Sequence, residues 1–236
     1  MLLDTALLSG GNVYVCPGRY KPSAAFGFQI GLETHLYGAG SGADPATATI
    51  LDQQEAVGTL VLFVPGSVPV TLSGIRVTGG TGSLGGSGGV MSNSLLPMVV
   101  DRCAIVDNVG HVTGGFYHYG QLTMTDSLVS GNSATDGVGG IHVQPGDPTA
   151  ATVIRSTTVS NNTGVDVGGI RFYDTDAAQT FTVEATCQVI DNISLQMAAP
   201  IAGGIGRAGL TAAVMTAAGT TVTGNTNPQC VGVTGC

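Results

Sequence analysis

The sequence has no tryptophan, and few of its 236 residues are charged or aromatic. Charged residues make up 9% of the chain and aromatic residues 5%. Only seven lysines and arginines stand against fifteen aspartates and glutamates, which gives a formal net charge of −8. Nucleic acids and anionic membrane surfaces are bound through clustered cations. The composition therefore argues against both classes of partner.

Long apolar runs are also missing. The longest run is LVLFV at residues 60–64, whereas about 20 apolar residues are needed to cross a bilayer. The N-terminal stretch MLLDTALLSGG has no basic residue and carries Asp4 within its apolar part, so it does not have the pattern of a signal peptide. We expect no membrane span, and either a cytosolic protein or a chain that begins after a removed leader.

Glycine, in contrast, is abundant. The chain has 38 glycines, about twice the usual share of roughly 7%. Its 43% hydrophobic content provides enough apolar surface to offset the entropy lost on ordering. Valine, threonine and isoleucine are frequent, and these side chains favour strands. The composition predicts an all-β protein with many turns.

Two markers repeat along the chain at intervals of about 24 to 35 residues. The first is a glycine pair followed by an apolar residue, at Gly88–Gly89, Gly114–Gly115, Gly139–Gly140, Gly168–Gly169 and Gly203–Gly204. The second is an asparagine that ends a strand-like segment, at Asn108, Asn132, Asn162, Asn192 and Asn225. A period in this range is typical of a solenoid.

The repeat predicts a parallel β-helix, because each unit reads as strand, Asn corner, loop, Gly-Gly corner and strand. Stacked units bury a continuous core between parallel sheets. We expect Asn at one corner because it tolerates the left-handed conformation and because stacked Asn side chains hydrogen-bond between rungs. We expect Gly at the other corner for its access to positive φ. The alternative is a β-sandwich, whose turn signals would recur every 8–12 residues.

A family resemblance supports this interpretation. The segments LTMTDSLVSGNSATDGVGGI and TVIRSTTVSNNTGVDVGGI resemble the right-handed parallel β-helix repeats of the pectate-lyase-like superfamily, especially those of bacterial surface and secreted proteins. The likeness covers about residues 12–230. It implies an extracellular or cell-surface location but no single activity, because the superfamily includes lyases, hydrolases, epimerases and adhesins.

The predicted architecture is one domain over residues 1–236, a single-stranded right-handed parallel β-helix of about seven or eight turns. Residues 1–11 form a short helical N-terminal cap, residues 12–225 the turns, and residues 226–236 a cysteine loop. In that loop Cys230 and Cys236 are close enough in sequence for a disulfide, which would indicate an oxidising compartment. Cys103 and Cys187 share one repeat position and are predicted to be buried free thiols, whereas Cys16 has no obvious partner.

The strands after the glycine pairs carry the candidate binding site. Their first positions are uniformly apolar, so odd positions point inward and even positions outward. Three successive rungs then present six outward side chains: Tyr117, Tyr119, His142, Gln144, Arg171 and Tyr173. Such a row could stack on sugar rings and hydrogen-bond their hydroxyls. The alternative is a row that only stabilises the sheet by cross-strand stacking.

Catalytic signals are weak. Glycoside hydrolysis normally uses two flanking carboxylates, and the outward row has none. The nearest acidic residues are Asp147, Asp174 and Asp176, which with Arg171 could serve a calcium-assisted lyase. We therefore predict a non-catalytic protein that recognises a polysaccharide or a cell-surface glycan, with no cofactor. A polysaccharide lyase or hydrolase is the alternative, and a structural spacer or adhesin segment is the second.

Overall fold

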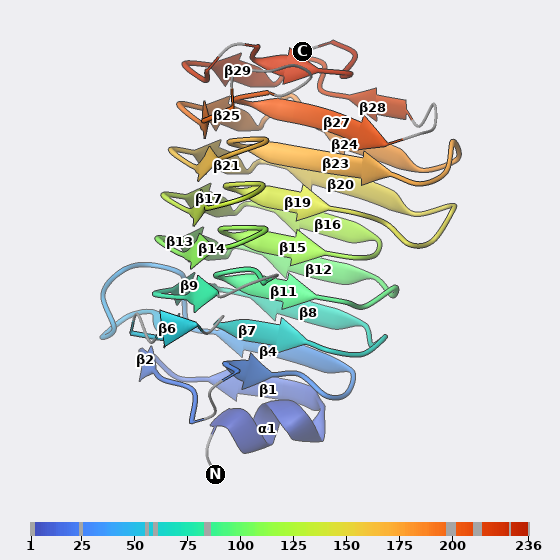
Figure 1. Ribbon diagram of the computed structural model, residues 1–236. Helices are drawn as coiled ribbons and strands as arrows, with labels where there is room; N and C mark the ends of the chain where they lie inside the picture. Colours follow the sequence, from blue (N-terminus) through green and yellow to red (C-terminus); the bar gives the residue numbers. More distant parts are fainter. Residues whose placement is uncertain are drawn as a thin grey trace.

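The chain forms one stack of short parallel strands, shown in a computed structural model (Figure 1). The structure describes residues 3–23, 26–54, 57–58, 61–82, 86–196, 202–209, 214–226 and 228–235. The chain visits four parallel sheets in turn, and each circuit makes one rung of the stack. The predicted parallel β-helix is confirmed. Sheets of eight strands agree with the predicted seven or eight turns.

Two of the eight-stranded sheets meet at the corner that follows each first strand of a rung. Sheet A contains β1 (Gly11–Val15), β4 (Thr34–Gly38), β8 (Val70–Ser73), β12 (Met98–Asp101), β16 (Leu122–Thr125), β20 (Ala151–Arg155), β24 (Thr180–Val183) and β28 (Val214–Thr216). Sheet B contains β2 (Gly18–Tyr20), β5 (Thr49–Asp52), β9 (Ile75–Thr78), β13 (Ala104–Val106), β17 (Leu128–Ser130), β21 (Thr158–Ser160), β25 (Gln188–Ile190) and β29 (Thr221–Thr223).

The other two sheets complete each rung. The six-stranded sheet D contains β6 (Val57–Gly58), β10 (Thr81–Gly82), β14 (Val109–Gly110), β18 (Ser133–Ala134), β22 (Thr163–Gly164) and β26 (Ile193–Ser194). The eight-stranded sheet C contains β3 (Phe28–Gln29), β7 (Leu62–Val64), β11 (Val90–Ser92), β15 (Phe116–His118), β19 (Ile141–Val143), β23 (Ile170–Asp174), β27 (Ile205–Gly209) and β30 (Cys230–Val231).

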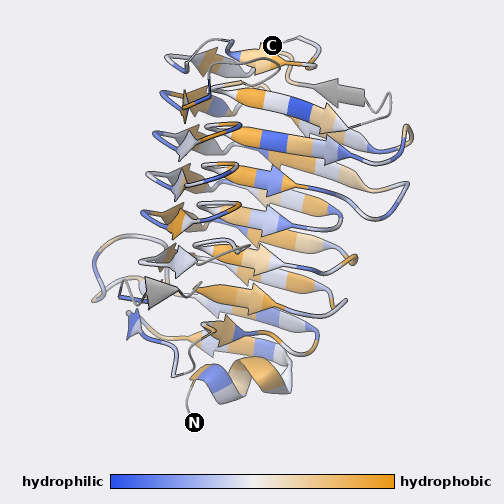
Figure 2. Cartoon of the chain, in the orientation of Figure 1, coloured by the Kyte–Doolittle hydropathy of each residue, from blue (hydrophilic) through white to orange (hydrophobic). Residues whose placement is uncertain are grey.

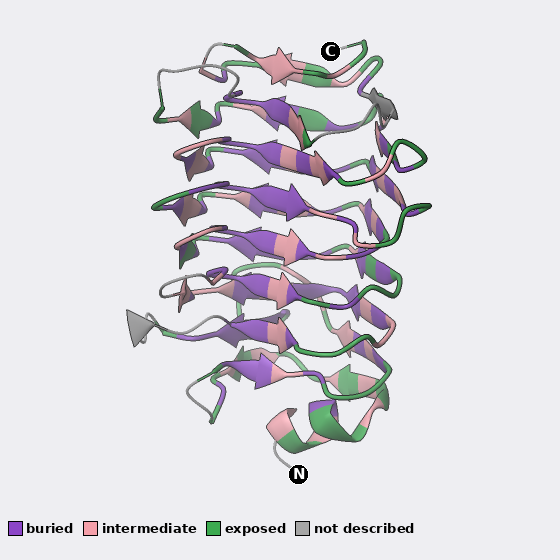
Figure 3. Cartoon of the chain, turned by 45° about the vertical axis from the view of Figure 1, so that its right-hand side comes forward, coloured by how far each residue is buried: buried purple, intermediate pink, exposed green. Residues whose placement is uncertain are grey.

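The core is a continuous column of apolar side chains inside the stack. Apolar and polar residues alternate along the strands, as the colours of β19 and β23 in Figure 2 show, and along β23 burial alternates with them. Phe172 of sheet C stacks on Phe181 of sheet A, with ring centroids 4.8 Å apart, so the core is filled from both sides. Exposed residues are concentrated in the loops between strands (Figure 3). No rung could bury its apolar face alone, which is why stacking stabilises the fold.

A buried asparagine ladder runs along the corner between sheets B and D. The Asn162 side-chain oxygen accepts hydrogen bonds from the backbone N–H and the Nδ2 of Asn132, at 3.0 and 2.9 Å. Its own Nδ2 donates to the Asn192 Oδ1 and to the Val129 carbonyl, both at 2.9 Å. The same pattern joins all five predicted asparagines: Asn108, Asn132, Asn162, Asn192 and Asn225. The predicted side-chain hydrogen bonding between rungs is confirmed.

The predicted left-handed conformation of these asparagines is wrong. It is the residue before each ladder asparagine that has positive φ: Asp107, Gly131, Asn161, Asp191 and Gly224. This preceding residue makes the turn, so the side-chain amide of the asparagine can point into the stack. The ladder position therefore requires asparagine for its side-chain donor and acceptor.

The reason predicted for the glycine pairs is also wrong. None of the five predicted pairs is among the glycines with positive φ. Instead, the backbones of neighbouring rungs approach too closely for a side chain. A Cβ on Gly115 would lie 2.7 Å from the Gly140 carbonyl oxygen and 3.0 Å from the Nδ2 of Asn132. The glycine corner and the asparagine ladder thus pack directly against each other.

The two ends of the stack are covered differently. At the N-terminus, α1 (Leu3–Ser9) packs against β3 and buries Leu7, as the predicted helical cap requires. At the other end, Gln229 takes the next place in the ladder, where its Oε1 accepts from the Asn225 Nδ2 at 2.8 Å. Cys230 is disulfide-bonded, and its predicted partner Cys236 lies outside the described residues. Among the described residues, no helix is long and apolar enough to cross a membrane.

The three other cysteines are free thiols. Cys103 and Cys187 are buried, which confirms the prediction for both, whereas Cys16 is exposed. Burial raises the pKa of the Cys103 thiol to about 12 and also raises the pKa of Cys187. Neither buried cysteine is therefore a thiolate at neutral pH.

Candidate functional site

Four of the six predicted binding residues lie on strands of sheet C, and Tyr119 and Gln144 follow the ends of β15 and β19; we call the six residues the outer strip. Tyr117, His142 and Arg171 occupy matching positions on three adjacent strands, β15, β19 and β23. Two residues further along the same rungs lie Tyr119, Gln144 and Tyr173. The register and the inward–outward alternation follow the prediction. The inward neighbours, including Phe116 and His118, are fully buried.

One ring contact joins neighbouring rungs within the first row of the strip, and another joins the two rows. Tyr117 meets His142 edge to face, with centroids 5.2 Å apart and an interplanar angle of 78°. The Arg171 guanidinium carbon lies 5.6 Å from the centroid of the Tyr173 ring, within the range of a cation–π contact. All three tyrosines of the strip are half-buried, so part of each ring faces solvent. Burial, and to a smaller extent the nearby Tyr119, raise the pKa of Tyr117.

His142 differs from the prediction because it is not open to solvent. Only 6% of the residue is exposed, between Tyr117 on one rung and Arg171 on the next. Burial and then the charge of Arg171 lower its pKa to about 3, so the imidazole is neutral. Neither ring nitrogen has a hydrogen-bond partner among the described residues. Leaving a buried polar group unsatisfied costs about 1–3 kcal/mol.

The one cation of the strip, Arg171, is neutralised by Asp166 beside it. The Arg171 Nη1 donates to the Asp166 Oδ2 at 2.8 Å, and both side chains are largely covered, at 21% and 34% exposure. Asp166 lies just before the glycine pair of the same rung. The sequence shows an acidic residue at this position but does not show that Arg171 is its partner. The two residues come together because the chain turns at the glycine pair between them.

The candidate catalytic residues do not form one cluster. Among the described residues, Arg171 forms its ion pair with Asp166 and not with Asp147, Asp174 or Asp176. Asp174 is buried and pairs with Arg207 of the next rung at 2.8 Å.

Asp147 and Asp176 instead stabilise loop turns. Asp147 accepts from the backbone N–H and the hydroxyl of Thr149, which lowers its pKa, and Asp176 accepts from the Ala178 N–H.

A buried glutamine that the sequence did not single out joins these two loops. The Gln179 Nε2 donates to the carbonyls of Pro145 and Asp147, at 2.9 and 2.8 Å. Its Oε1 accepts from the Thr175 N–H at 2.8 Å. The loops beside the strip are therefore held in place by an amide, and an isolated glutamine in a polar loop gives no sequence signal for this role.

A small pocket adjoins the strip on the side of sheet D. Its volume is about 160 Å³, and it is lined by Gly86, Ser87, Met91, Val112, Thr113, Tyr117, His142 and Gln144. The walls are mainly apolar, but they include two buried polar side chains without hydrogen-bond partners among the described residues, His142 and the Thr113 hydroxyl. The pocket was not predicted, because it combines residues from three loops and three strands.

The comparisons with known proteins identify no relative. No family model, no curated protein and no solved structure matches the chain. The site must therefore be interpreted from its own geometry. Among the described residues, no group of three or more His, Cys, Asp or Glu side chains is arranged to hold a metal ion.

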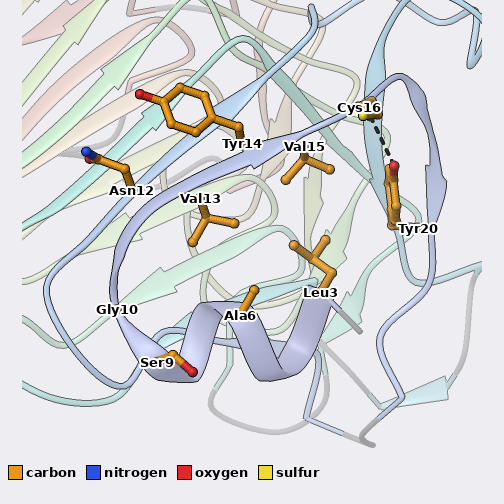
Figure 4. A pocket seen from close by; sticks show the side chains of 10 residues that line it. All are labelled: Leu3, Ala6, Ser9, Gly10, Asn12, Val13, Tyr14, Val15, Cys16 and Tyr20. Atoms are coloured by element: carbon orange, nitrogen blue, oxygen red, sulfur yellow. Dashed lines mark hydrogen bonds between the residues drawn. The ribbon is translucent and has the colours of Figure 1, made fainter. Parts of the chain in front are cut away.

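A second pocket lies at the N-terminal end of the stack, between α1 and β1 (Figure 4). Its volume is about 470 Å³. Leu3 and Ala6 of the helix face Val13 and Val15 of the strand, and the Tyr20 hydroxyl donates to the Cys16 carbonyl at 3.1 Å. Its lining is the inner side of the helical cap and the unpaired side of the first strand. The pocket is the space left between the helical cap and the first strand, so its presence needs no ligand to explain it.

Proposed function

We propose that the chain binds a polysaccharide or cell-surface glycan along the outer strip of sheet C. The observation that carries this proposal is the in-register row of Tyr117, His142 and Arg171 on β15, β19 and β23, with a second polar or aromatic residue two positions further along each rung. The rungs repeat about every 4.8 Å, and the three half-exposed tyrosines lie on the first and third of these rungs. Aromatic faces with hydroxyl groups at their ends suit sugar rings, which present both apolar faces and hydroxyls.

The charge of the strip favours an uncharged glycan. The charges of Arg171 and Asp166 compensate each other at 2.8 Å, and His142 is neutral. The whole chain carries a formal charge of −8, which repels polyanions such as uronates. Binding to a neutral glycan would depend little on salt, because screening acts on interactions between charges.

The arrangement of acidic residues supports binding rather than cleavage. Cleavage by the usual glycosidase chemistry needs two carboxyl groups on either side of one bond. Asp166 is held by Arg171 and Asp174 by Arg207. The other two candidates, Asp147 and Asp176, accept hydrogen bonds within their own loops. A lyase or hydrolase would need these residues to rearrange.

An extracellular or cell-surface location is part of the proposal. The disulfide at Cys230 supports it, because disulfides persist in oxidising compartments. The resemblance of the repeats to secreted and surface β-helix proteins points the same way. A rigid stack that presents one row of rings to solvent also suits display at a surface, where the ligand is a long polymer.

The test is binding to a glycan array and to immobilised neutral and acidic polysaccharides. The triple variant Tyr117→Ala, Tyr119→Ala and Tyr173→Ala should lose most of the binding. The matched control is Tyr14→Ala, since Tyr14 is 76% exposed and stacks on Tyr37 of sheet A at 5.1 Å. Equal binding by the triple variant and the control would contradict the proposal. New reducing ends or unsaturated products after incubation with a polysaccharide would favour an enzyme. Failure of the unchanged protein to bind any glycan would favour a structural spacer.

A further inference from the structure

The pocket beside His142 has a feature that the outer strip alone does not explain. Two buried polar side chains line it without partners among the described residues, the His142 imidazole and the Thr113 hydroxyl. Native proteins pair most buried polar groups, and an exception at a pocket indicates a missing partner. We propose that this pocket receives the acetamido group of an N-acetylated sugar in the bound glycan. This inference rests on the proposed glycan binding, whose ligand class it narrows.

The size of the pocket fits a substituent rather than a sugar ring. Its volume is about 160 Å³, and a cavity of about 150 Å³ holds one benzene molecule. An acetamido group is smaller than benzene, whereas a whole pyranose with its hydroxyls is larger. The sugar ring would therefore remain on the tyrosines of the strip, and only a side group would enter the pocket.

The lining matches both parts of an acetamido group. Met91 and Val112 provide apolar surface for the methyl. A neutral imidazole carries one N–H donor and one acceptor nitrogen, which complement the carbonyl and the N–H of an amide. A hydroxyl would leave the apolar wall without contact, and a methyl alone would leave His142 unpaired. A carboxylate offers only acceptors and would bring a charge into an uncharged pocket.

The rungs without the pocket provide an internal comparison. Ser87, Thr113, Val138 and Val167 occupy one ladder position on four successive rungs. The two that line the pocket are polar, and the two beyond it are valine. Packing alone is satisfied by valine at this position. The hydroxyls thus occur where the pocket is and would offer a further hydrogen bond to its occupant.

Access to the imidazole requires a side chain to move. Gln144 lines the pocket, is half-buried and makes no side-chain hydrogen bond to the described residues. Its side chain can therefore rotate within the pocket that it lines together with His142. Side-chain rotamer changes of this kind are common on binding, even where the backbone stays fixed.

The test uses glycans of identical linkage that differ in one group. Chito-oligosaccharides, their fully de-N-acetylated forms and cello-oligosaccharides share a β-1,4-linked backbone and carry acetamido, amino and hydroxyl groups. Further matched pairs of other linkages would be compared on a glycan array. We expect the acetamido member of a bound pair to bind about 5- to 30-fold more tightly, the effect of one or two hydrogen bonds between neutral groups.

Two variants separate the pocket from the strip. His142→Phe keeps a ring beside Tyr117 and should reduce the acetamido preference, measured as the ratio of the two affinities, to about 1-fold. Thr113→Val should reduce the preference by a smaller factor. His35→Phe is the control, because His35 lies on sheet A and already bonds the Thr71 hydroxyl at 2.9 Å. Its acetamido preference should equal that of the unchanged protein.

The outcomes distinguish this inference from the proposed function. Binding that requires the three tyrosines but shows no acetamido preference, or a preference that survives His142→Phe, would overturn the pocket assignment alone. If the unchanged protein bound no glycan at all, both the proposed function and the pocket assignment would be overturned. Thermal unfolding of each variant checks that a lost preference does not come from a lost fold.

Discussion

The ring of Tyr117 covers the imidazole of His142 edge to face, at 5.2 Å between centroids. This contact places a neutral histidine on the outer face of a sheet and yet keeps it from water. His142 gains packing from the tyrosine and loses hydrogen bonds to solvent, and neither nitrogen is compensated by a described residue. Arg171 on the next rung further disfavours the protonated form.

Replacing His142 with phenylalanine should stabilise the fold. The change removes two unsatisfied nitrogens and retains a ring between Tyr117 and Arg171. We expect the free energy of unfolding to rise by about 1–3 kcal/mol, measured by urea denaturation. His35→Phe should have the opposite sign, since it removes a formed hydrogen bond to Thr71. A loss of stability in His142→Phe would mean that the nitrogens are satisfied in solution.

Acid should destabilise the fold through two histidines. Burial lowers the pKa of His118 to about 4 and that of His142 to about 3, from an ordinary 6.5. The unfolded chain takes up these protons below pH 6.5 and the folded chain does not. Stability is therefore complete above pH 6.5 and falls with pH, by about 1.4 kcal/mol per pH unit for each histidine.

Urea denaturation at a series of pH values from 7.5 down to 3 checks this dependence. The loss from His118 should end near pH 4, where the folded protein also binds the proton, and the loss from His142 should continue to about pH 3. His142→Phe should remove about half of the slope between pH 6 and 4.5. An identical pH dependence in the variant and the unchanged protein would show that His142 titrates alike in both states.

The asparagine ladder should be sensitive to single substitutions. Asn162→Ala removes the acceptor of the Asn132 N–H and Nδ2 and a donor to the Val129 carbonyl, and we expect a loss of about 3 kcal/mol in the free energy of unfolding. Asn162→Asp should cost more than alanine at neutral pH, because it buries a charge and sets a carboxylate oxygen against the Val129 carbonyl and the Asn192 Oδ1. The control is the exposed neighbour Asn161, whose φ of 55° glycine adopts readily. Asn161→Gly should change stability by no more than about 0.5 kcal/mol.

The register of the stack could be predicted because each repeat contains two independent sequence markers. Ladder asparagines and glycine pairs mark the two ends of the sheet D segment in each rung, and apolar residues alternate along the strands that follow. Together these markers fix which side chains share a position on neighbouring strands, such as Tyr117 and His142. The predicted outward row on sheet C follows directly from that register.

The contacts of the charged residues could not be predicted in the same way. Arg171 pairs across a glycine corner with Asp166, and Arg207 pairs with Asp174 of the preceding rung. Such pairs depend on the path of a corner or on the space left inside the last turns, and no residue pattern repeats with them. The same holds for the burial of His142, which depends on the size of its two neighbours.

The ion pair between Arg207 and Asp174 should be important for the C-terminal turns. Arg207 holds an inward position opposite Phe172, and its Nη2 donates to the Oδ2 of the fully covered Asp174 carboxylate at 2.8 Å. Arg207→Leu would leave that buried carboxylate without the guanidinium and should cost about 3–5 kcal/mol. The double variant with Asp174→Leu should recover a large part of the loss. Equal stability of the single and double variants in urea denaturation would contradict this coupling.

The free cysteines should react in a fixed order. Cys16 is exposed, whereas Cys103 is buried with a pKa raised to about 12 and Cys187 is buried with a raised pKa. Because the thiolate is the reactive form, a thiol reagent at pH 8 should modify Cys16 in the folded protein, with Cys103 and Cys187 modified only after denaturation. Peptide mapping by mass spectrometry identifies each site, and Cys16→Ser is the control that should abolish the fast reaction. Fast labelling of Cys103 without denaturant would mean that the corner between sheets A and B opens in the native state.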